Sequence, residues 1–244
     1  MTVRLDRALV ARGQVATRAR AQAEIKAGHV SIDGCVVAKP AHMVPDHVDI
    51  SLAPSENKFV SRAALKLVHG LDTFNVAVSG KQALDIGAST GGFTQVLLER
   101  GASRVYAVDV GHGQLADEVR QSPRVTSLEG LNAKLLTAEH MPEPPSVIVS
   151  DVSFIGLEKA LPAALSLAAP GACLVALIKP QFEVGPGKVG RGGIVKDPAL
   201  HEDVCARIRQ WLAHEMGWQV LGLTDSPIAG GDGNKEFLIG AQRP

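Results

Sequence analysis

The 244-residue sequence predicts an α/β protein in which a small α+β domain precedes a doubly wound, Rossmann-like sheet that ends in an antiparallel hairpin. Three observations support this. Strand-like and helix-like segments alternate from about residue 82, a glycine-rich turn follows the first apolar strand, and the first fifty residues carry two helical patterns and a hairpin pattern. The expected boundaries are a domain at 1–52, a linker at 53–59 and a second domain at 60–244.

Composition excludes several classes of protein. Hydrophobic residues make up 45% and charged residues 20%, which is typical of a folded chain rather than a disordered one. Three widely spaced cysteines do not suit a disulfide framework or a paired-cysteine zinc site, the histidines show no ligand spacing, and no metal site is expected. The N-terminus lacks the apolar core of a signal peptide, so we expect a cytoplasmic protein.

The uncharged stretch 160–178 approaches the length of a membrane span. Pro162 and the Pro170-Gly171 pair interrupt it. This punctuation favours a helix ending near Ala169, then a turn and a buried strand at Cys173–Ile178. No membrane partner is therefore expected.

The first thirty residues carry six Lys and Arg against two Asp and Glu, in a chain that is neutral overall. Helical patterns at 5–9 and 19–25 are each followed by a glycine and precede a hairpin pattern around Asp33-Gly34. The excess of basic residues in this region favours a nucleic-acid partner. The alternative is an ordinary solvated helix face.

This region resembles the S4-type RNA-binding domain. The matching text is Arg-Leu-Asp-x-x-Leu-Val at 4–10, Thr-Arg-x-x-Ala at 17–21, Ile-x-x-Gly-x-Val-x-Ile-Asp-Gly at 25–34 and Val-x-Lys-Pro at 37–40. The resemblance implies binding to structured RNA through phosphates and shape. The implied contacts are Arg4, Arg7, Arg18, Arg20 and Lys26.

The second part places a glycine-rich turn, residues 87–92, between the strand Gln82–Ile86 and a helix. The turn lacks the Gly-x-Gly-x-x-Gly of dinucleotide sites and the Gly-Lys-Ser/Thr of phosphate loops. Asp109 follows Asp85 by 24 residues, near the spacing of an acid that binds ribose hydroxyls. Close backbone approach without a phosphate cradle suits S-adenosylmethionine. The alternative is a plain tight turn between strand and helix.

Four polar residues stand at strand ends or near helix starts: Lys66, Asp151, Lys179 and Glu236. Each has an ordinary structural explanation, because a lysine on an apolar helix can extend its amine to solvent and a strand-end aspartate can be a cap. Beside the glycine-rich turn, however, the four together resemble the tetrad of FtsJ-type ribose 2′-O-methyltransferases.

The wider sequence resembles the TlyA family, historically labelled haemolysins, whose members are rRNA cytidine 2′-O-methyltransferases. The motifs are Ser-Arg-x-x-x-Lys-Leu at 61–67, Asp-x-Gly-Ala-Ser-Thr-Gly-Gly-Phe-Thr at 85–94, Asp-Val-Gly-x-Gly-Gln-Leu at 109–115, Asp-Val-Ser-Phe-Ile at 151–155, Lys-Pro-Gln-Phe-Glu-Val-Gly at 179–185, Gly-Gly-Ile-Val-x-Asp-Pro at 192–198 and Ser-Pro-Ile-x-Gly-x-x-Gly-Asn-x-Glu-Phe at 226–237. The resemblance implies a methyltransferase domain, S-adenosylmethionine as cofactor, and ribosomal RNA or ribosomal subunits as partner. The implied cofactor contacts are Asp85, Gly87, Ser89, Thr90, Gly91, Gly92, Phe93, Asp109, Val110, Asn132 and Asp151.

Two features depart from the family pattern. Glu129-Gly130-Leu131 precedes Asn132 where the family usually has Arg-Thr. The sequence also ends soon after the final strand, which is typical of the shorter relatives that modify only large-subunit rRNA. We therefore expect 23S rRNA as the substrate, with 16S rRNA open as a second one.

The implied reaction is attack of a ribose hydroxyl on a sulfonium methyl group. Our hypothesis is that Lys179 is the general base, that Asp151 orients it, and that Lys66 and Glu236 position the hydroxyl. Burial and a second lysine nearby would favour the neutral amine.

The glycine-rich loop 183–196 carries Lys188 and Arg191. It is either a mobile flap that touches RNA phosphates or a plain surface loop. The expected RNA contacts outside the first domain are Arg62, Lys188 and Arg191. Two other functions stay open: a haemolysin-like RNA-binding protein without methyl transfer, and a small-molecule methyltransferase.

Overall fold

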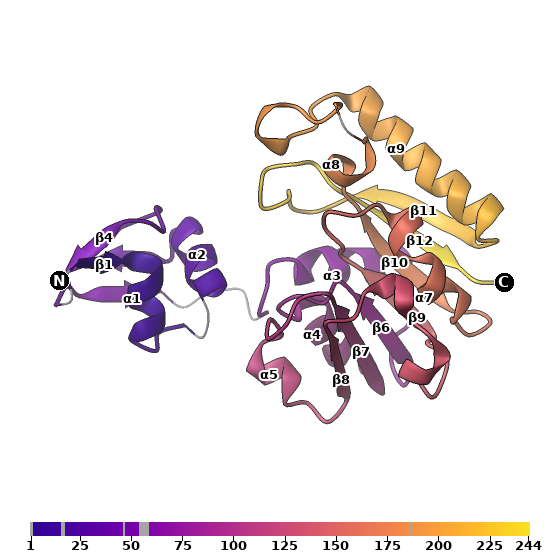
Figure 1. Ribbon diagram of the computed structural model, residues 1–244, viewed down its shortest axis with the longest axis horizontal. Coiled ribbons are helices and arrows are strands. Elements are labelled where there is room, and N and C mark those ends of the chain that lie inside the picture. The colour runs from indigo at the N-terminus through magenta and orange to yellow at the C-terminus, as the bar shows by residue number, and fades with distance from the viewer. Residues whose placement is uncertain (1, 16–17, 46, 54–58, 186) are drawn as a thin grey trace. The chain divides into compact units, whose positions relative to one another are not determined.

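The computed structural model describes residues 1–244 except 1, 16–17, 46, 54–58 and 186 (Figure 1). The chain forms two compact units, Met1–Ser61 and Arg62–Pro244. Most of the expected linker at 53–59 falls on residues 54–58 and lies outside the described residues.

The first unit packs two short helices on two small antiparallel sheets, one of β1 and β4 and one in the order β3-β2-β5. Its core contains Leu5, Leu9, Ile25, Val30 and Ile50. The expected helices and hairpin are present, and both turn residues of the hairpin, Asp33 and Gly34, have positive φ angles as a two-residue turn requires. The elements are β1 Thr2–Arg4, α1 Leu5–Ala11, α2 Arg18–Lys26, β2 Val30–Ile32, β3 Cys35–Val36, β4 Met43–Pro45 and β5 Ile50–Leu52.

The second unit is built on a seven-stranded sheet in the order β11-β12-β10-β9-β6-β7-β8. The five strands from β10 to β8 are parallel to their neighbours, and β12 is antiparallel to both β10 and β11. The predicted doubly wound sheet with a C-terminal antiparallel hairpin is therefore confirmed. Its strands are β6 Gln82–Ile86, β7 Arg104–Asp109, β8 Val125–Glu129, β9 Val147–Ser150, β10 Cys173–Ile178, β11 Gln219–Asp225 and β12 Phe237–Gln242.

Helices cover both faces of this sheet. On one face, Val204 and Ile208 of α9 pack in one apolar cluster with Ile148, Leu174 and Ile239. The helices and turns are α3 Ala64–Thr73, α4 Gly92–Glu99, α5 Asp117–Arg120, η1 Ala133–Leu135, η2 Ala138–His140, α6 Leu157–Ala160, α7 Pro162–Ser166, α8 Pro180–Glu183, η3 Arg191–Gly193, α9 Pro198–Gln210 and the π-helical turn η4 Trp211–Glu215.

Helix α3 lies against the opposite face of the sheet, because Gly70 allows close approach. A Cβ atom at Gly70 would lie 2.7 Å from Cγ1 of Val175 on β10 and 3.4 Å from Cδ2 of Leu238 on β12. Lys66 is one helical turn before Gly70 and therefore shares its face of α3. This packing brings the lysine to the sheet.

The uncharged stretch is divided as its prolines predict. Two short helices, α6 and α7, are followed by the turn at Pro170-Gly171 and by β10, although the second helix ends at Ser166 rather than near Ala169. None of the helices in the described part of the chain is long and apolar enough to cross a membrane.

Candidate active site

The predicted site residues leave the strands at one end of the sheet. Ile178 of β10 pairs with Phe237 of β12, so Lys179 and Glu236 occupy neighbouring positions just outside that pair. Ser150 of β9 pairs with Ala176 of β10 and Ile86 of β6, which places Asp151 beside the turn that begins at Gly87. Because successive side chains alternate across a strand, the residues following Ser150 and Ile178 face the side that α3 covers.

Lys66 and Glu236 form a buried ion pair. Nζ of Lys66 donates a hydrogen bond of 2.5 Å to Oε2 of Glu236, and the two side chains are 8% and 3% exposed. A lysine on an apolar helix normally reaches for solvent, whereas here the close packing of α3 directs it to the sheet. Burial of a charge needs a partner, and Glu236 supplies it across 170 residues of sequence.

Lys179 and Asp151 form a second ion pair, with Nζ 2.6 Å from Oδ1 and side chains that are 11% and 15% exposed. The contact is not aligned as a hydrogen bond, since Oδ1 has no hydrogen-bond donor in the described structure. Instead, Nζ donates to Oγ of Ser153 at 2.9 Å. The carboxylate and the hydroxyl together fix the amine of Lys179. Sequence reasoning missed Ser153, although it stands inside the Asp-Val-Ser-Phe-Ile motif.

The glycine-rich turn has the backbone geometry that only small residues permit. Gly87 has φ +85°, and a Cβ atom there would lie 2.9 Å from the backbone oxygen of Asp151. The backbone N–H groups of Gly87 and Ala88 both donate to the carbonyl of Val108 on β7. Gly91, with φ +93°, precedes the first residue of α4. The absence of a side chain at Gly87 thus lets the turn approach the backbone of Asp151 closely.

Asp109 is anchored at the end of β7. Its Oδ2 accepts from the backbone N–H of Ser89 at 2.8 Å, and its Oδ1 accepts from that of Gly111 at 2.7 Å. A carboxylate oxygen has two lone pairs, so both oxygens can still accept from ribose hydroxyls. Val110, which follows, is 65% exposed and offers an apolar surface to a nucleoside base. These features fit the nucleoside part of S-adenosylmethionine.

Asp85 lies inside the protein rather than on the surface of the turn. Its side chain is 0% exposed, and Oδ2 accepts from the hydroxyl of Thr94 on α4 at 2.6 Å. Oδ1 is buried without a hydrogen-bond partner among the described residues. Burial raises the pKa of Asp85 to about 7, and the nearby Asp151 carboxylate adds to the rise while Thr94 opposes it. A direct cofactor contact for Asp85 stays a prediction.

The other expected cofactor contacts are spread around the turn. Ser89 is exposed at φ +47°, Thr90 is half-buried, and Phe93 is buried, so the ring of Phe93 serves packing. Asn132 is exposed, and its Oδ1 accepts from the backbone N–H of Lys134 as the cap of η1. That cap is a structural role that the sequence did not suggest. Ligand contacts at these positions stay predictions. No cluster of His, Cys, Asp and Glu that could hold a metal ion occurs among the described residues.

The basic residues of the first unit are not one uniform surface. Arg7 and Lys26 are exposed on α1 and α2, and Arg4 and Arg18 both contact the buried Asp6. Arg20 differs, because Nη1 donates to the carbonyls of Phe59 and Val60 and Nε pairs with Glu24 at 2.7 Å. Much of its guanidinium is therefore committed to the protein itself. In the second unit, Arg62 and Lys188 are exposed, and the side chain of Arg191 lies outside the described residues.

The loop 183–196 is pinned near its C-terminal end by Asn234. The Asn234 amide is fully buried, accepts from the backbone N–H of Val195 at 2.9 Å, and donates to the carbonyl of Gly193 at 2.9 Å. Nε2 of His201 lies 2.9 Å from the carbonyl of Val195. Asn234 is two residues from Glu236, so the loop is hydrogen-bonded to the segment that carries Glu236 into β12. Asn234 stands inside the motif at 226–237, but the sequence does not indicate this structural role.

Phe154 is a third residue whose role the sequence does not indicate. It is 90% exposed with φ +66°, a backbone conformation that bulky residues rarely adopt. Its ring centroid lies 5.1 Å from that of Phe182 on α8. An exposed aromatic ring one residue from Ser153 is a surface on which a nucleobase can stack.

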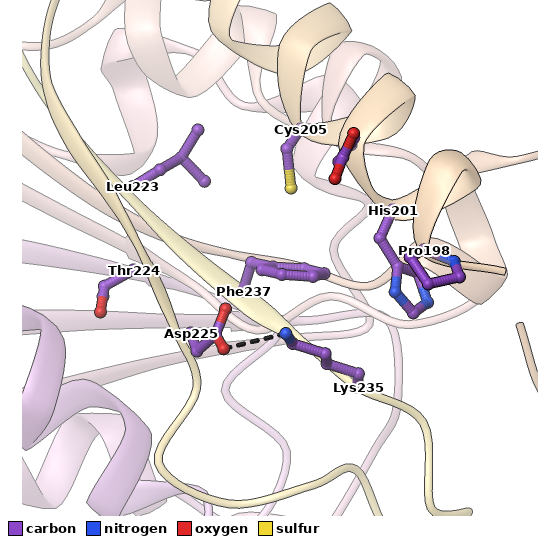
Figure 2. Close-up of a pocket in the computed structure, with 9 residues that line it drawn as sticks. Pro198, His201, Cys205, Leu223, Thr224, Asp225, Lys235 and Phe237 are labelled. Carbon is purple, nitrogen blue, oxygen red and sulfur yellow. Dashed lines mark ion pairs between the residues drawn. The ribbon is translucent and has the colours of Figure 1, made fainter. Parts of the chain in front are cut away.

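A separate surface groove lies between α9 and the β11–β12 hairpin (Figure 2). Phe237 forms its floor, and Nζ of Lys235 lies 5.0 Å from that ring and 2.9 Å from Oδ2 of Asp225. Burial raises the pKa of the Cys205 thiol in this groove to about 11, so the thiol is protonated at neutral pH. Phe237 precedes Leu238 and follows Glu236, and alternation places it on the face opposite the tetrad. The groove is therefore distinct from the candidate active site.

Comparisons with known proteins identify the family and the fold. Residues 59–243 match the model of the FtsJ-like methyltransferase family, and residues 3–50 match that of the S4 domain. The 16S/23S rRNA (cytidine-2′-O)-methyltransferase TlyA of Mycobacterium tuberculosis is 48% identical over 97% of this chain and 88% of its own length. Hemolysin A of Brachyspira hyodysenteriae is 42% identical over 97% and 98%.

Solved structures give the same answer for the fold. A structure described as a hemolysin from Streptococcus thermophilus has a TM-score of 0.79 at 40% identity, covering 99% of this chain and 88% of the other. An O-methyltransferase from Bacillus cereus, solved with SAH, has a TM-score of 0.52 at 19% identity over 78% and 84%, a likeness in fold alone. With an S4 domain in front and ion-paired lysines at the carboxyl end of its sheet, this chain belongs to the FtsJ-like methyltransferase family and, within it, to the TlyA proteins.

Proposed function

We propose that this protein uses S-adenosylmethionine to methylate the 2′-hydroxyl of a cytidine ribose in ribosomal RNA. The observation that carries the proposal is the Lys179–Asp151 pair, held at 2.6 Å beside the glycine-rich turn. Residues 1–52 serve as the RNA-binding domain and residues 60–244 as the methyltransferase domain. The names of relatives in Mycobacterium tuberculosis and Campylobacter jejuni support cytidine as the target.

The cofactor is held at the carboxyl ends of β6 and β7, where Gly87, Ser89, Asp109 and Val110 fit its nucleoside part. When bound, it supplies an electrophilic methyl group on a sulfonium. Asp151 lies between this turn and Lys179, because a Cβ at Gly87 would touch its backbone and its carboxylate pairs with the amine. The reacting centre therefore belongs next to Nζ of Lys179.

Lys179 acts as the general base. For this role the ammonium group of the Lys179–Asp151 pair first gives up a proton to solvent. The neutral Nζ then accepts the proton of the ribose hydroxyl as the hydroxyl oxygen attacks the methyl group, and Asp151 stabilises the ammonium ion that forms again. The Oγ of Ser153 fixes the direction of Nζ. Glu236 lies at the position next to Lys179 and is paired with Lys66 of α3, and this pair orients the hydroxyl. Correct placement of the hydroxyl oxygen about 3–3.5 Å from the methyl carbon supplies part of the rate.

RNA is bound by features outside this centre. In the first unit, Arg4, Arg7, Arg18 and Lys26 offer cations to phosphates, and in the second unit Arg62 and Lys188 do the same. Phe154 stacks on the base of the target nucleotide, since base–aromatic stacking contributes about 1–3 kcal/mol. This stacking accounts for an exposed ring at a strained backbone position.

The test is transfer of a labelled methyl group from S-adenosylmethionine to 50S and 30S subunits, followed by mapping of the labelled nucleotide. We expect label in a cytidine ribose of 23S rRNA, in a dinucleotide that resists alkali because the 2′-oxygen is blocked. Label on 30S subunits as well adds 16S rRNA as a substrate. Binding of subunits without transfer identifies an RNA-binding protein, and label on small molecules alone identifies a different methyltransferase. Either of these two results overturns the proposal.

A further inference from the structure

Asp6 in the first unit collects four hydrogen bonds although its side chain is 0% exposed. Oδ1 accepts from Nε of Arg4 at 3.0 Å, and Oδ2 accepts from Nη2 of Arg4 at 2.9 Å. Oδ2 also accepts from Nε of Arg18 at 3.0 Å and from Nε2 of Gln22 at 2.9 Å. One buried carboxylate thus joins β1 to α2.

This carboxylate keeps its charge at neutral pH. Hydrogen bonding from Arg4 holds the pKa of Asp6 well below its usual range, with further lowering by Gln22 and Arg18, and these contacts outweigh its partial desolvation. A buried carboxylate would be expensive without such partners. The negative charge in turn allows two guanidinium groups to lie close together, because it offsets their mutual repulsion.

The two arginines keep donors for a ligand. Asp6 engages Arg4 through Nε and Nη2, and Arg18 through Nε alone. Within the described part of the chain, Nη1 of Arg4 and both terminal nitrogens of Arg18 are therefore left to other acceptors. Their side chains are 35% and 48% exposed. Paired guanidinium groups with a fixed orientation suit phosphate oxygens, which they can bind in a fork geometry.

We propose that Asp6 is a positioning residue that holds Arg4 and Arg18 as a paired clamp for phosphates of the RNA backbone. This inference rests on the proposed rRNA function, because it names the residue that prepares part of the RNA surface. The proposed clamp consists of Arg4 and Arg18 and leaves out Arg20, because the guanidinium of Arg20 is bound to Glu24 and to the backbone at Phe59 and Val60.

The substitution Asp6→Asn separates positioning from simple charge. Removing a negative charge should tighten RNA binding if only net charge matters. If Asp6 positions the arginines, binding of the full-length protein to 23S rRNA should weaken about tenfold despite the added charge. The slope of log affinity against log salt should become shallower by about one to two, since ordered phosphate contacts are lost.

Asp33→Asn is the matched control. Asp33 is exposed in the β2–β3 turn at φ +47°, a conformation that asparagine tolerates, and the charge change is the same. We expect its RNA affinity to stay equal to that of the natural protein or to rise slightly. An Asp6→Asn protein that binds as tightly as Asp33→Asn overturns the inference. Failure of the natural protein to bind rRNA overturns the proposed function instead.

Two further measurements guard against a folding artefact. Thermal unfolding followed by circular dichroism defines a temperature at which Asp6→Asn is folded, and binding is measured there. In an Arg4→Met, Arg18→Met background, the same Asp6→Asn change should have no additional effect on RNA affinity. An equal loss of affinity with and without the two arginines overturns the positioning role.

Discussion

Nζ of Lys179 lies 2.6 Å from Oδ1 of Asp151, and the two residues directly follow the neighbouring parallel strands β10 and β9. The parallel register of β9 and β10 brings these two strand ends together, and Pro180 begins α8 immediately after the lysine. The amine is therefore held by the sheet rather than by a flexible loop. Each function assigned to Lys179 depends on this fixed placement.

Replacing Lys179 with methionine should lower the rate of methyl transfer by about 10²–10⁴, the usual contribution of a general base. Affinity for rRNA and for S-adenosylmethionine should change little, because the variant keeps the length of the side chain. Single-turnover transfer to 50S subunits and filter binding measure the two properties. Lys81→Met, just before β6 at the opposite end of the sheet, is the control and should be fully active. Near-normal turnover by the Lys179 variant would remove the residue from the mechanism.

Removing Glu236 should destabilise the second unit, because Lys66 would remain buried without its partner. For Glu236→Ala we expect a loss of about 3–5 kcal/mol in the free energy of unfolding. Asp225→Asn breaks the Lys235–Asp225 pair, whose side chains are 52% and 65% exposed, and should cost less than about 1 kcal/mol. Urea unfolding curves measure both, and equal losses for the two variants would contradict the buried role of Lys66.

The stability of the second unit should fall as pH rises from about 4 to about 7. Asp85 has a folded pKa of about 7, whereas an unfolded aspartate titrates near 4. Between these values the folded state holds a proton that the unfolded state has lost, so raising the pH favours unfolding, and the effect is complete above pH 7. Asp85→Asn should remove this contribution, which urea unfolding at pH 5 and pH 8 measures. A pH dependence identical in both proteins argues against a protonated Asp85.

Removing the hydrogen bonds between Asn234 and the loop 183–196 should make the loop more accessible to protease. Lys188 and Lys196 are trypsin sites within it, and Asn234→Ala loses the bonds to Gly193 and Val195. We expect faster cleavage at these lysines, seen by mass spectrometry under native conditions. Gln219→Ala, an exposed position on β11, is the control, and its cleavage pattern should match that of the natural protein. An unchanged cleavage rate in the Asn234 variant would show that other contacts hold the loop.

The sheet could be predicted because its inner strands are apolar and separated by glycine turns. The sequence pattern does not predict β8, because Val125–Glu129 mixes Thr, Ser and Glu as an edge strand does. It does not predict helix α9 either. Tetrad positions followed from motif resemblance, but the pairing of Lys66 with Glu236 depends on strand register and on Gly70, which no local pattern encodes. The sequence places Arg20 with the other RNA-contact arginines. It cannot show that Arg20 donates to the carbonyls of Phe59 and Val60, because these acceptors lie about forty residues away in the chain.

The placement of β12 between β10 and β11 has a consequence for synthesis of the protein. A growing chain can pair β6, β7, β9 and β10 before β12 leaves the translating ribosome. At that stage β10 is an edge strand, and the amine of Lys66 lacks its partner Glu236. Glu236 reaches Lys66 only when β12 pairs between β10 and β11. The buried Lys66–Glu236 pair is thus completed only by the last strand of the sheet, so a chain truncated before β12 would carry the glycine-rich turn but leave Lys66 without this partner.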